Sequence, residues 1–407
     1  MANASYGERD ELNWDKNLGR YNVYDLNYDK NGNITQLKRK GWYNDERGYE
    51  YRNIDLLSYT YDGNQLKAVE DDVSGNLTTN DFRDHGSHSG TEYTYDVIGR
   101  LLTDDNKHIT NIQYNSLNLP DQISFGDTAR IVYLYDAAGR KLSKKVIHGL
   151  NQESVDQTDY INGFVYSNNS LGFINMSEGR LFKKGDGTFR YDYHLTDHLG
   201  NVRCTFTDLD DDAQADIIQE DHFYPFGMSI DGLSYRGDLE NNFLYQGKER
   251  QPEALDTDND GTPDKRFLWY DFSARYYDPQ LGRWHVSDPA NQHYSGYLAM
   301  GNNPLNSIDP DGLYADRLNF LGTTMFRMDA YKKSTWNRTH SHFEWRYDGS
   351  LVFVRRGDWI FETEIPAVDE GTSWIDGVAG GIARSELDWR VGEGLLNQFL
   401  ENADAET

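Results

Sequence analysis

The chain has 407 residues, which is enough for two or three domains with cores of their own. Hydrophobic residues make up only 37% of it, yet aromatic residues reach 14%, including 29 tyrosines. This excludes a disordered acidic chain, because such chains are poor in aromatic residues. The formal net charge of -27 argues against a protein that coats nucleic acid or an anionic membrane along its whole length.

Cys204 is the only cysteine, so an intrachain disulfide is excluded and the redox compartment stays open. Residues 1–12 lack the apolar segment of a signal peptide, and no later stretch approaches 18 apolar residues. We therefore expect no membrane span. If the protein is exported, an upstream segment or a dedicated secretion machine has to carry it.

A short pattern recurs along the chain, in which a tyrosine and an aspartate are followed by a glycine. Alternating residues before the turn, such as Tyr93 and Tyr95, place rings on one face of a strand. The aspartate can open a turn by accepting backbone N–H groups, and the glycine supplies the positive φ that the turn needs. The copies begin at Tyr28, Tyr61, Tyr95 and Tyr135, and a degenerate copy lies at Tyr114 and Asn115.

These copies predict a mostly β fold. A single hairpin cannot bury its own face, so we expect the copies to stack into one continuous antiparallel sheet. The alternative is a set of ordinary antiparallel hairpins that share no larger architecture.

The repeated Tyr-Asp turns resemble the YD repeats of Rhs, toxin-complex C and teneurin-like proteins. Residues 193–203, 222–228 and 244–249 are similar to the late part of this family, so the resemblance covers most of residues 20–312. It implies a spiralling antiparallel sheet that walls off a hollow shell. This stretch is too short to close a shell, so we expect a partial wall or a wall completed by another subunit.

Residues 275–313 closely resemble the Rhs repeat-associated core. The resemblance implies autoproteolysis between Leu313 and Tyr314, with no cofactor required. It assigns the essential acids to Asp288 and Asp309, and the supporting cation to Arg275. The sequence departs from the family at residues 290–291, where many members have glycine, but the acids are intact.

The chemistry implied is that of an aspartic dyad. Two carboxylates held close together cannot both ionise, so one of them retains a proton. The ionised acid takes a proton from water, and the protonated acid polarises the scissile carbonyl. Arg275 would hold one acid ionised through a charge-assisted hydrogen bond. The competing interpretation is that Asp288 and Asp309 merely cap turns.

Two acidic runs have the ligand spacing of a calcium-binding loop. The first also has the characteristic glycine, Gly261, but Phe267 stands where the loop normally ends in a bidentate glutamate. Solvated acidic hairpin tips are the alternative for both runs, and calcium would be structural. The expected ligands are Asp256, Asp258, Asp260 and Asp264 in the first run, and Asp208, Asp210, Asp212 and Asp216 in the second.

The composition changes after Leu313, because residues 314–407 hold 3 of the 29 tyrosines but 5 of the 9 tryptophans. We therefore predict three domains. They are a YD-repeat wall over residues 1–250, a core with the autoproteolytic segment over 251–313, and a variable effector domain over 314–407.

The last domain is predicted to be a small α+β unit. Residues 341–347 and 350–356 alternate around a two-residue turn signal, and residues 380–402 have the pattern of a helix. Such a turn would place His342 opposite Arg355.

A polar face of this hairpin supplies candidate chemistry. A histidine, a glutamate and an arginine could cleave a phosphodiester, as in a nuclease, or two histidines with a carboxylate could bind zinc. A solvated polar face without chemistry is the third interpretation. The residues concerned are His340, His342, Glu344 and Arg355.

The resemblance as a whole implies a polymorphic toxin used in competition between bacteria. Its shell would enclose its own C-terminal domain as cargo and release it by self-cleavage. The expected partners are an immunity protein, a component of a secretion machine and, for a nuclease tail, a nucleic acid. Such a protein would be secreted or displayed at the cell surface. The alternative is a non-enzymatic surface adhesin or carbohydrate-binding repeat protein with an inert tail.

Overall fold

The computed structural model divides the chain into two units, Met1–Phe326 and Arg327–Thr407. Within the described part of the chain, no helix is long and apolar enough to cross a membrane. The described residues are 8–10, 13–15, 19–45, 48–73, 80–85, 90–127, 129–149, 154–210, 214–237, 241–255, 265–318, 324–325, 342–345, 351–354 and 363–364.

Two antiparallel sheets dominate the first unit. The first joins four strands, β3 to β6, and the second joins fourteen strands, β7 to β20, each paired with the strand before it in the chain. The first sheet consists of β3 (Val23–Tyr28), β4 (Ile34–Asp45), β5 (Gly48–Asp62) and β6 (Gln65–Asp71). The second consists of β7 (Tyr93–Tyr95), β8 (Leu101–Asp104), β9 (Ile109–Tyr114), β10 (Pro120–Phe125), β11 (Ala129–Tyr135), β12 (Lys141–His148), β13 (Ser154–Ile161), β14 (Phe164–Ser167), β15 (Ser170–Met176), β16 (Gly179–Lys183), β17 (Phe189–Thr196), β18 (Val202–Thr207), β19 (Asp216–Glu220) and β20 (Tyr235–Arg236).

Shorter elements complete the described chain. A four-stranded sheet has the order β21-β24-β25-β26, and the remaining strands form small sheets of two or three strands each. The strands are β1 (Glu8–Asp10), β2 (Asn13–Asp15), β21 (Glu249–Arg250), β22 (Ala254–Leu255), β23 (Lys265–Arg266), β24 (Tyr270–Asp271), β25 (Tyr276–Asp278), β26 (Arg283–Trp284), β27 (Ser307–Ile308), β28 (Asp316–Leu318), β29 (Thr324–Met325), β30 (His342–Trp345), β31 (Leu351–Val354) and β32 (Thr363–Glu364). Short 3-10 helices are η1 (Asp105–Lys107), η2 (Tyr245–Gly247) and η3 (Met300–Asn302).

The repeated Tyr-Asp turns form as their sequence predicts. Asp96 Oδ1 accepts the backbone N–H groups of Ile98 and Arg100 at 3.0 and 2.9 Å, and Gly99 has a φ of 85°. Asp29 and Asp136 accept the equivalent groups in their own copies. The prediction of an antiparallel β fold built on these turns is confirmed.

Two copies depart from this pattern in instructive ways. Asn115 closes the same turn with its amide oxygen, which accepts N–H groups at 2.9 and 3.1 Å. Asp62 instead pairs directly with Gln65, so that Gly63 and Asn64 form a tight two-residue turn between β5 and β6. A fifth turn of the long type lies at Asp197, within residues 193–203.

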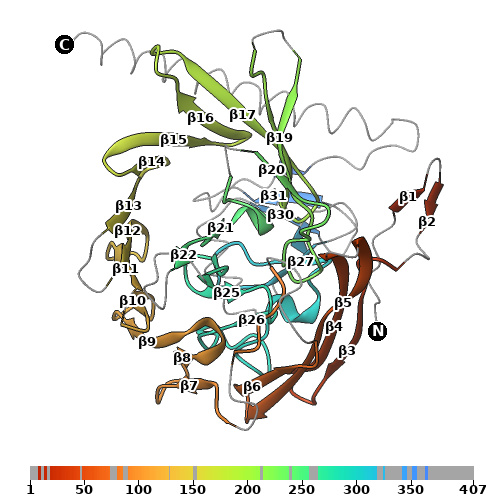
Figure 1. Ribbon diagram of the computed structural model, residues 1–407. Helices are drawn as coiled ribbons and strands as arrows, with labels where there is room; N and C mark the ends of the chain where they lie inside the picture. The colour runs from red at the N-terminus through yellow and green to blue at the C-terminus, as the bar shows by residue number, and fades with distance from the viewer. Residues whose placement is uncertain are drawn as a thin grey trace. The chain divides into compact units, whose positions relative to one another are not determined.

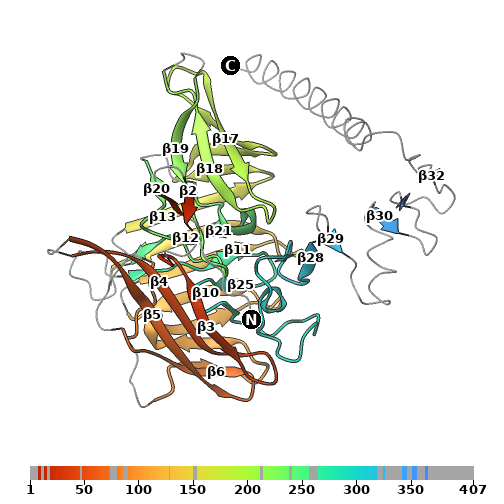
Figure 2. The ribbon, with the colours of Figure 1, turned by 90° about the vertical axis from the view of Figure 1, so that its right-hand side faces the viewer.

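The concave faces of both sheets pack against the described residues between 249 and 313, which are called the core segment below. One cluster of buried side chains joins Leu37 and Leu57 of the first sheet to Ile123 and Ile131 of the second, and it includes Trp269 of the segment that follows β23. Figure 1 shows β25 and β26 inside the curve that the wall strands describe, and Figure 2 shows the strands β3 to β6 of the first sheet from another side. The partial wall therefore obtains its core by folding around residues that come later in the chain.

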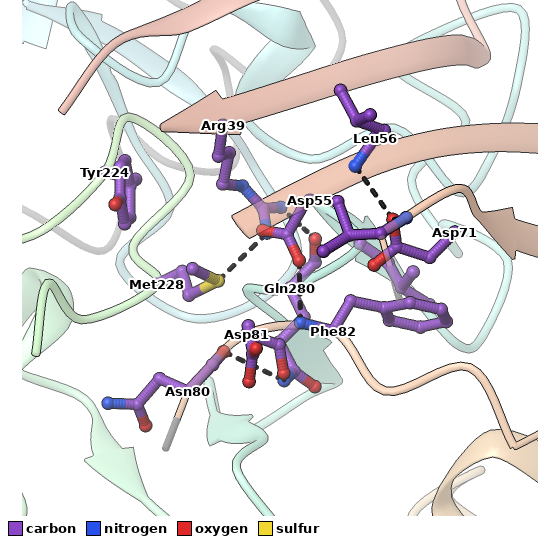
Figure 3. A network of polar contacts seen from close by, with 12 residues as sticks. Arg39, Asp55, Leu56, Asp71, Asn80, Asp81, Phe82, Tyr224, Met228 and Gln280 are labelled. Carbon is purple, nitrogen blue, oxygen red and sulfur yellow. Dashed lines mark hydrogen bonds and ion pairs between the residues drawn. The ribbon is translucent and has the colours of Figure 1, made fainter. Parts of the chain in front are cut away.

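A buried ion pair ties the wall to this core segment (Figure 3). Arg39 of β4 contacts Asp55 of β5 at 2.7 Å, and both side chains are almost completely buried. The same guanidinium donates to the Gln280 carbonyl oxygen, while the other Asp55 oxygen accepts the Phe82 N–H at 2.8 Å. Burying two charges costs solvation free energy, which the ion pair and these additional hydrogen bonds have to offset.

A second buried group of charges links the long sheet to β21. The Lys141 ammonium group lies 2.5 Å from Glu249 and 2.7 Å from Asp271, and Lys144 contacts Glu249 at 3.4 Å. Burial alone would raise the pKa of Glu249, but the two lysines outweigh it and lower the pKa to about 2. The wall and the core segment are therefore joined by charge as well as by apolar packing.

The second unit contains an antiparallel sheet of β30, β31 and β32. Here the predicted register is wrong by one residue, because His342 pairs with Val354 instead of Arg355. Trp345 pairs with Leu351, so five residues separate the strands where a two-residue turn was expected. The helix predicted over residues 380–402 lies outside the described residues.

We predict that Arg39→Met lowers the free energy of unfolding by about 3–5 kcal/mol, because it leaves the Asp55 carboxylate buried without its cation. Urea unfolding followed by tryptophan fluorescence measures this change. Arg39→Met combined with Asp55→Leu should recover much of the loss. The exposed pair Lys38–Asp25 is the matched control, and Lys38→Met should leave the urea midpoint in place. Equal shifts in Arg39→Met and Lys38→Met would contradict the prediction.

Candidate functional site

The bond predicted to be cut lies in the loop of a β-hairpin. Strands β27 and β28 pair antiparallel, with Ile308 opposite Asp316, so the loop between them spans residues 309–315. The Leu318 N–H also donates to the Asn306 carbonyl at 2.7 Å. The chain thus continues beyond Leu313 as a strand of the first unit.

Arg275 lies between the two predicted acids and contacts both of them. Its Nη2 lies 3.4 Å from Asp309 Oδ2 and its Nη1 lies 3.6 Å from Asp288 Oδ1. Its Nε donates to the Gly312 carbonyl oxygen, directly before the segment predicted to be cut. All three charged side chains are buried. The guanidinium carbon also stacks 4.3 Å from the centre of the Trp284 ring, which holds its plane.

Each acid also caps a turn. Asp288 accepts the N–H groups of Ala290 at 2.8 Å and Gln292 at 2.9 Å. Asp309 Oδ1 accepts the Gly312 N–H at 2.8 Å, which leaves Oδ2 facing Arg275. The capping interpretation and the catalytic interpretation therefore describe different oxygens of Asp309.

The electrostatics of Asp309 favour its protonated form more than those of an ordinary aspartate. Burial raises the pKa of Asp309 to about 6, although Arg275 and the Gly312 N–H act in the opposite direction. Burial also lowers the pKa of Arg275, and the two acids oppose that effect. One buried guanidinium therefore shares its charge between two carboxyl groups.

Glycine is required at the turn itself. Gly312 has a φ of 75°, a region that other residues rarely adopt. A Cβ added there would lie 2.8 Å from the Phe272 carbonyl oxygen and 3.0 Å from the backbone nitrogen of Arg275. The close approach of the loop to Arg275 thus depends on the missing side chain.

Three further residues hold this loop, and the sequence analysis did not single them out as site residues. Gln246 accepts the Asp309 N–H at 2.8 Å, Lys248 donates to the Pro310 carbonyl at 2.6 Å, and Gln292 accepts the Ala315 N–H at 2.9 Å. The first two lie in residues 244–249, whose similarity to the family was the available signal. The sequence carries no signal that marks Gln292, apart from its place four residues after Asp288.

The second acidic run is partly gathered. Carboxylate oxygens of Asp208, Asp210 and Asp216 lie within 4.8 Å of one another. Asp216 also accepts the Leu209 N–H at 2.8 Å. Asp212 lies outside the described residues, as do all four ligands predicted for the first run: Asp256, Asp258, Asp260 and Asp264. Calcium binding at either run stays a prediction.

The tail candidates are described only as backbone, where they are described at all. His342 and Glu344 lie two residues apart on β30. His340 and Arg355 lie outside the described residues. Neither the nuclease nor the zinc interpretation is tested by these positions, but the corrected register removes the predicted pairing of His342 with Arg355.

No family model matches the chain. Over 118 residues it is 30% identical to toxin subunit YenC2 of Yersinia entomophaga, a match that covers 28% of this chain and 10% of that protein. Over 109 residues it is likewise 30% identical to toxin subunit YenC1 of the same organism, a match that covers 26% of this chain and 10% of that protein. It is also 30% identical over 121 residues to salivary gland surface protein 1 of Aedes aegypti, covering 30% of this chain and 3% of that protein.

Solved structures with a similar arrangement include a Tc holotoxin pore of Photorhabdus luminescens. The likeness has a TM-score of 0.47 and 19% sequence identity, and covers 76% of this chain and 16% of that one. The chain spans between 3% and 10% of the length of the curated relatives it matches.

Proposed function

We propose that the chain is the C-terminal part of a toxin-complex, Rhs-type toxin that cuts itself between Leu313 and Tyr314 and thereby frees its effector tail. The observation that carries the proposal is the buried Arg275 guanidinium, which contacts Asp288, Asp309 and the Gly312 carbonyl at once. The similarity to toxin subunits supports the same assignment.

In this mechanism the two acids have different roles. Asp288 accepts two backbone N–H groups and faces Arg275, contacts that suit a carboxylate acting as the base. It takes a proton from water as the water oxygen bonds to the Leu313 carbonyl carbon. Asp309, whose pKa is raised by burial, acts as the protonated acid that hydrogen-bonds the carbonyl oxygen.

The intermediate then collapses with cleavage of the bond between Leu313 and Tyr314. The Tyr314 nitrogen takes up the proton that Asp288 accepted from water and leaves as an amine, and Leu313 ends in a carboxylate. Arg275 stabilises the negative charge that the two acids and the developing oxyanion share. No metal or organic cofactor is needed to balance these steps.

We also propose a setting for this reaction. The tail would be the cargo, and partner subunits, a secretion machine and an immunity protein would act with it, because two sequence relatives are named as toxin subunits. From the same similarity to toxin subunits we also propose that the protein is secreted. A tail nuclease acting on nucleic acid is the effector chemistry that His342 and Glu344 support.

The acid pair is tested by the mass of the purified chain. We expect wild type to appear as two fragments separated at Leu313–Tyr314, whereas Asp288→Asn and Asp309→Asn each remain one polypeptide. Denaturing electrophoresis with intact-mass spectrometry measures both. Asp96→Asn is the matched control and should be cut like wild type, because Asn115 already closes a repeat turn with an amide. An intact wild-type chain would favour the adhesin alternative.

The pH dependence follows from the protonation state of Asp309. Because its pKa is about 6, it is protonated below that pH and loses its proton as the pH rises. We expect the first-order rate of self-cleavage to fall as the pH increases through about 6, because Asp309 then loses the proton with which it hydrogen-bonds the scissile carbonyl. Refolding the denatured precursor into buffers from pH 4.5 to 8 and sampling by electrophoresis gives the profile. A rate that rises steadily over this range would reverse the assigned roles.

The effector is tested by expressing residues 314–407 in bacteria under an inducible promoter. We expect growth arrest, and relief of the arrest by His342→Ala if His342 takes part in the chemistry. Culture density and DNA integrity after induction are the measurements. Unimpaired growth would argue against an effector tail, and arrest that persists in His342→Ala would place its chemistry elsewhere.

A further inference from the structure

Two glutamine side chains hold the backbone on the two sides of the proposed scissile bond. On the upstream side, Gln246 Oε1 accepts the Asp309 N–H at 2.8 Å and Nε2 donates to the Ser307 carbonyl at 3.4 Å. On the downstream side, Gln292 Oε1 accepts the Ala315 N–H at 2.9 Å. Both contacts cross long distances in the sequence, so neither is part of a local turn.

The Gln292 contact is coupled to one of the acids. Asp288 Oδ2 accepts the Gln292 backbone N–H, and Oδ1 accepts that of Ala290. The turn is completed by the Asn291 N–H, which donates to the Asp288 carbonyl at 3.1 Å. The side chain that reaches Ala315 therefore starts from a turn that the proposed base itself holds.

Gln246 is held in an unusual backbone conformation. Its φ of 50° lies in the left-handed region, which a residue with a side chain rarely adopts. Its backbone N–H donates to Asn201 Oδ1 at 2.8 Å, which fixes the residue in that conformation. The strained residue directs its amide at the strand that leads to Asp309.

The anchors lie immediately around the bond. The Gly312 carbonyl is held by Arg275 and the Ala315 N–H is held by Gln292, so only Leu313 and Tyr314 lie between them. The Leu313 N–H is held in turn by Asp311 Oδ1 at 3.1 Å. A peptide unit fixed at both ends loses little further freedom on the way to the transition state.

We propose that Gln246 and Gln292 are positioning residues for self-cleavage, forming an amide clamp that presents the Leu313–Tyr314 peptide to the two acids. The inference rests on the proposed function. It predicts that the clamp affects the rate of cleavage through its acceptor oxygens, and not through the stability of the fold.

The test compares three variants of the full chain, each refolded from denaturant at pH 5.5 and sampled over time. Gln292→Met removes the acceptor at nearly constant size and should slow cleavage by about tenfold to a hundredfold, the cost of a displacement near 1 Å. Gln292→Glu retains an acceptor oxygen and should stay within about threefold of wild type, since the anchoring hydrogen bond is kept. Gln246→Met and Gln246→Glu should show the same contrast.

Gln122→Met is the matched control, because Gln122 lies on β10 and its amide bonds only Ser124 among the contacts described for it. It should cleave at the wild-type rate. Hydrogen exchange of the peptide covering residues 313–318 supplies a second measurement, made in the non-cleaving Asp309→Asn chain. Adding Gln292→Met to that chain should raise exchange in this peptide and leave the wall strands unchanged.

The outcomes separate the two proposals. A wild-type rate in Gln292→Met, or equal slowing in the Met and Glu variants, overturns the clamp while self-cleavage stands. A wild-type chain that never cuts overturns the proposed function and the positioning role with it. In that case the exchange measurement still shows whether Gln292 anchors Ala315.

Discussion

A buried guanidinium needs several partners at once, and Arg275 obtains them from segments that are far apart in the chain. Two carboxyl groups and two backbone carbonyls surround it, and Trp284 covers its face. Removing a charge from water is costly unless such partners are in place. The loops that carry Asp288, Asp309 and Gly312 therefore have to converge when the core folds, and the candidate site results from that requirement.

The wall makes this convergence possible. Its concave faces pack against the core segment, and two buried sets of charges join them at separate places, through Arg39 and through Lys141. If the core segment withdrew, Lys141 would lose both of its carboxylate partners, and Arg39 would keep Asp55 but lose the Gln280 carbonyl. The wall and the core segment are best understood as one cooperative unit, in which neither part has a complete interior alone.

Local turn chemistry explains how much of this fold the sequence could predict. The Tyr-Asp turns depend on hydrogen bonds within five residues, so Asp29, Asp96 and Asp136 could be assigned without any tertiary information. The same kind of local signal predicted the wrong turn in the tail. There, Asp348 and Gly349 suggested a two-residue turn, but the observed pairing skips five residues. A shift of one residue exchanges the faces of a strand, so the predicted partner of His342 was lost.

The site was predictable only where a family pattern marked it. Asp288, Asp309 and Arg275 were assigned from the resemblance, and the structure brings their charged groups into contact. Gln246 contacts a residue 63 positions away and Gln292 one 23 positions away, and no periodicity or spacing links them. Contacts of this kind depend on how loops pack, which composition and alternation do not encode.

The two interpretations of the acids turn out to be compatible for a geometric reason. A carboxylate has two oxygens, and Asp309 uses one to cap its turn while the other faces Arg275. Capping fixes the side-chain rotamer, and a fixed rotamer is what a proton-transferring group requires. Both oxygens of Asp288 accept N–H groups of its turn, and one of them also lies within reach of Arg275. These contacts fix the side chain and occupy some of its lone pairs. The turn that looks merely structural is thus the means by which each acid is aimed, and any chemistry at Leu313 has to proceed from that arrangement.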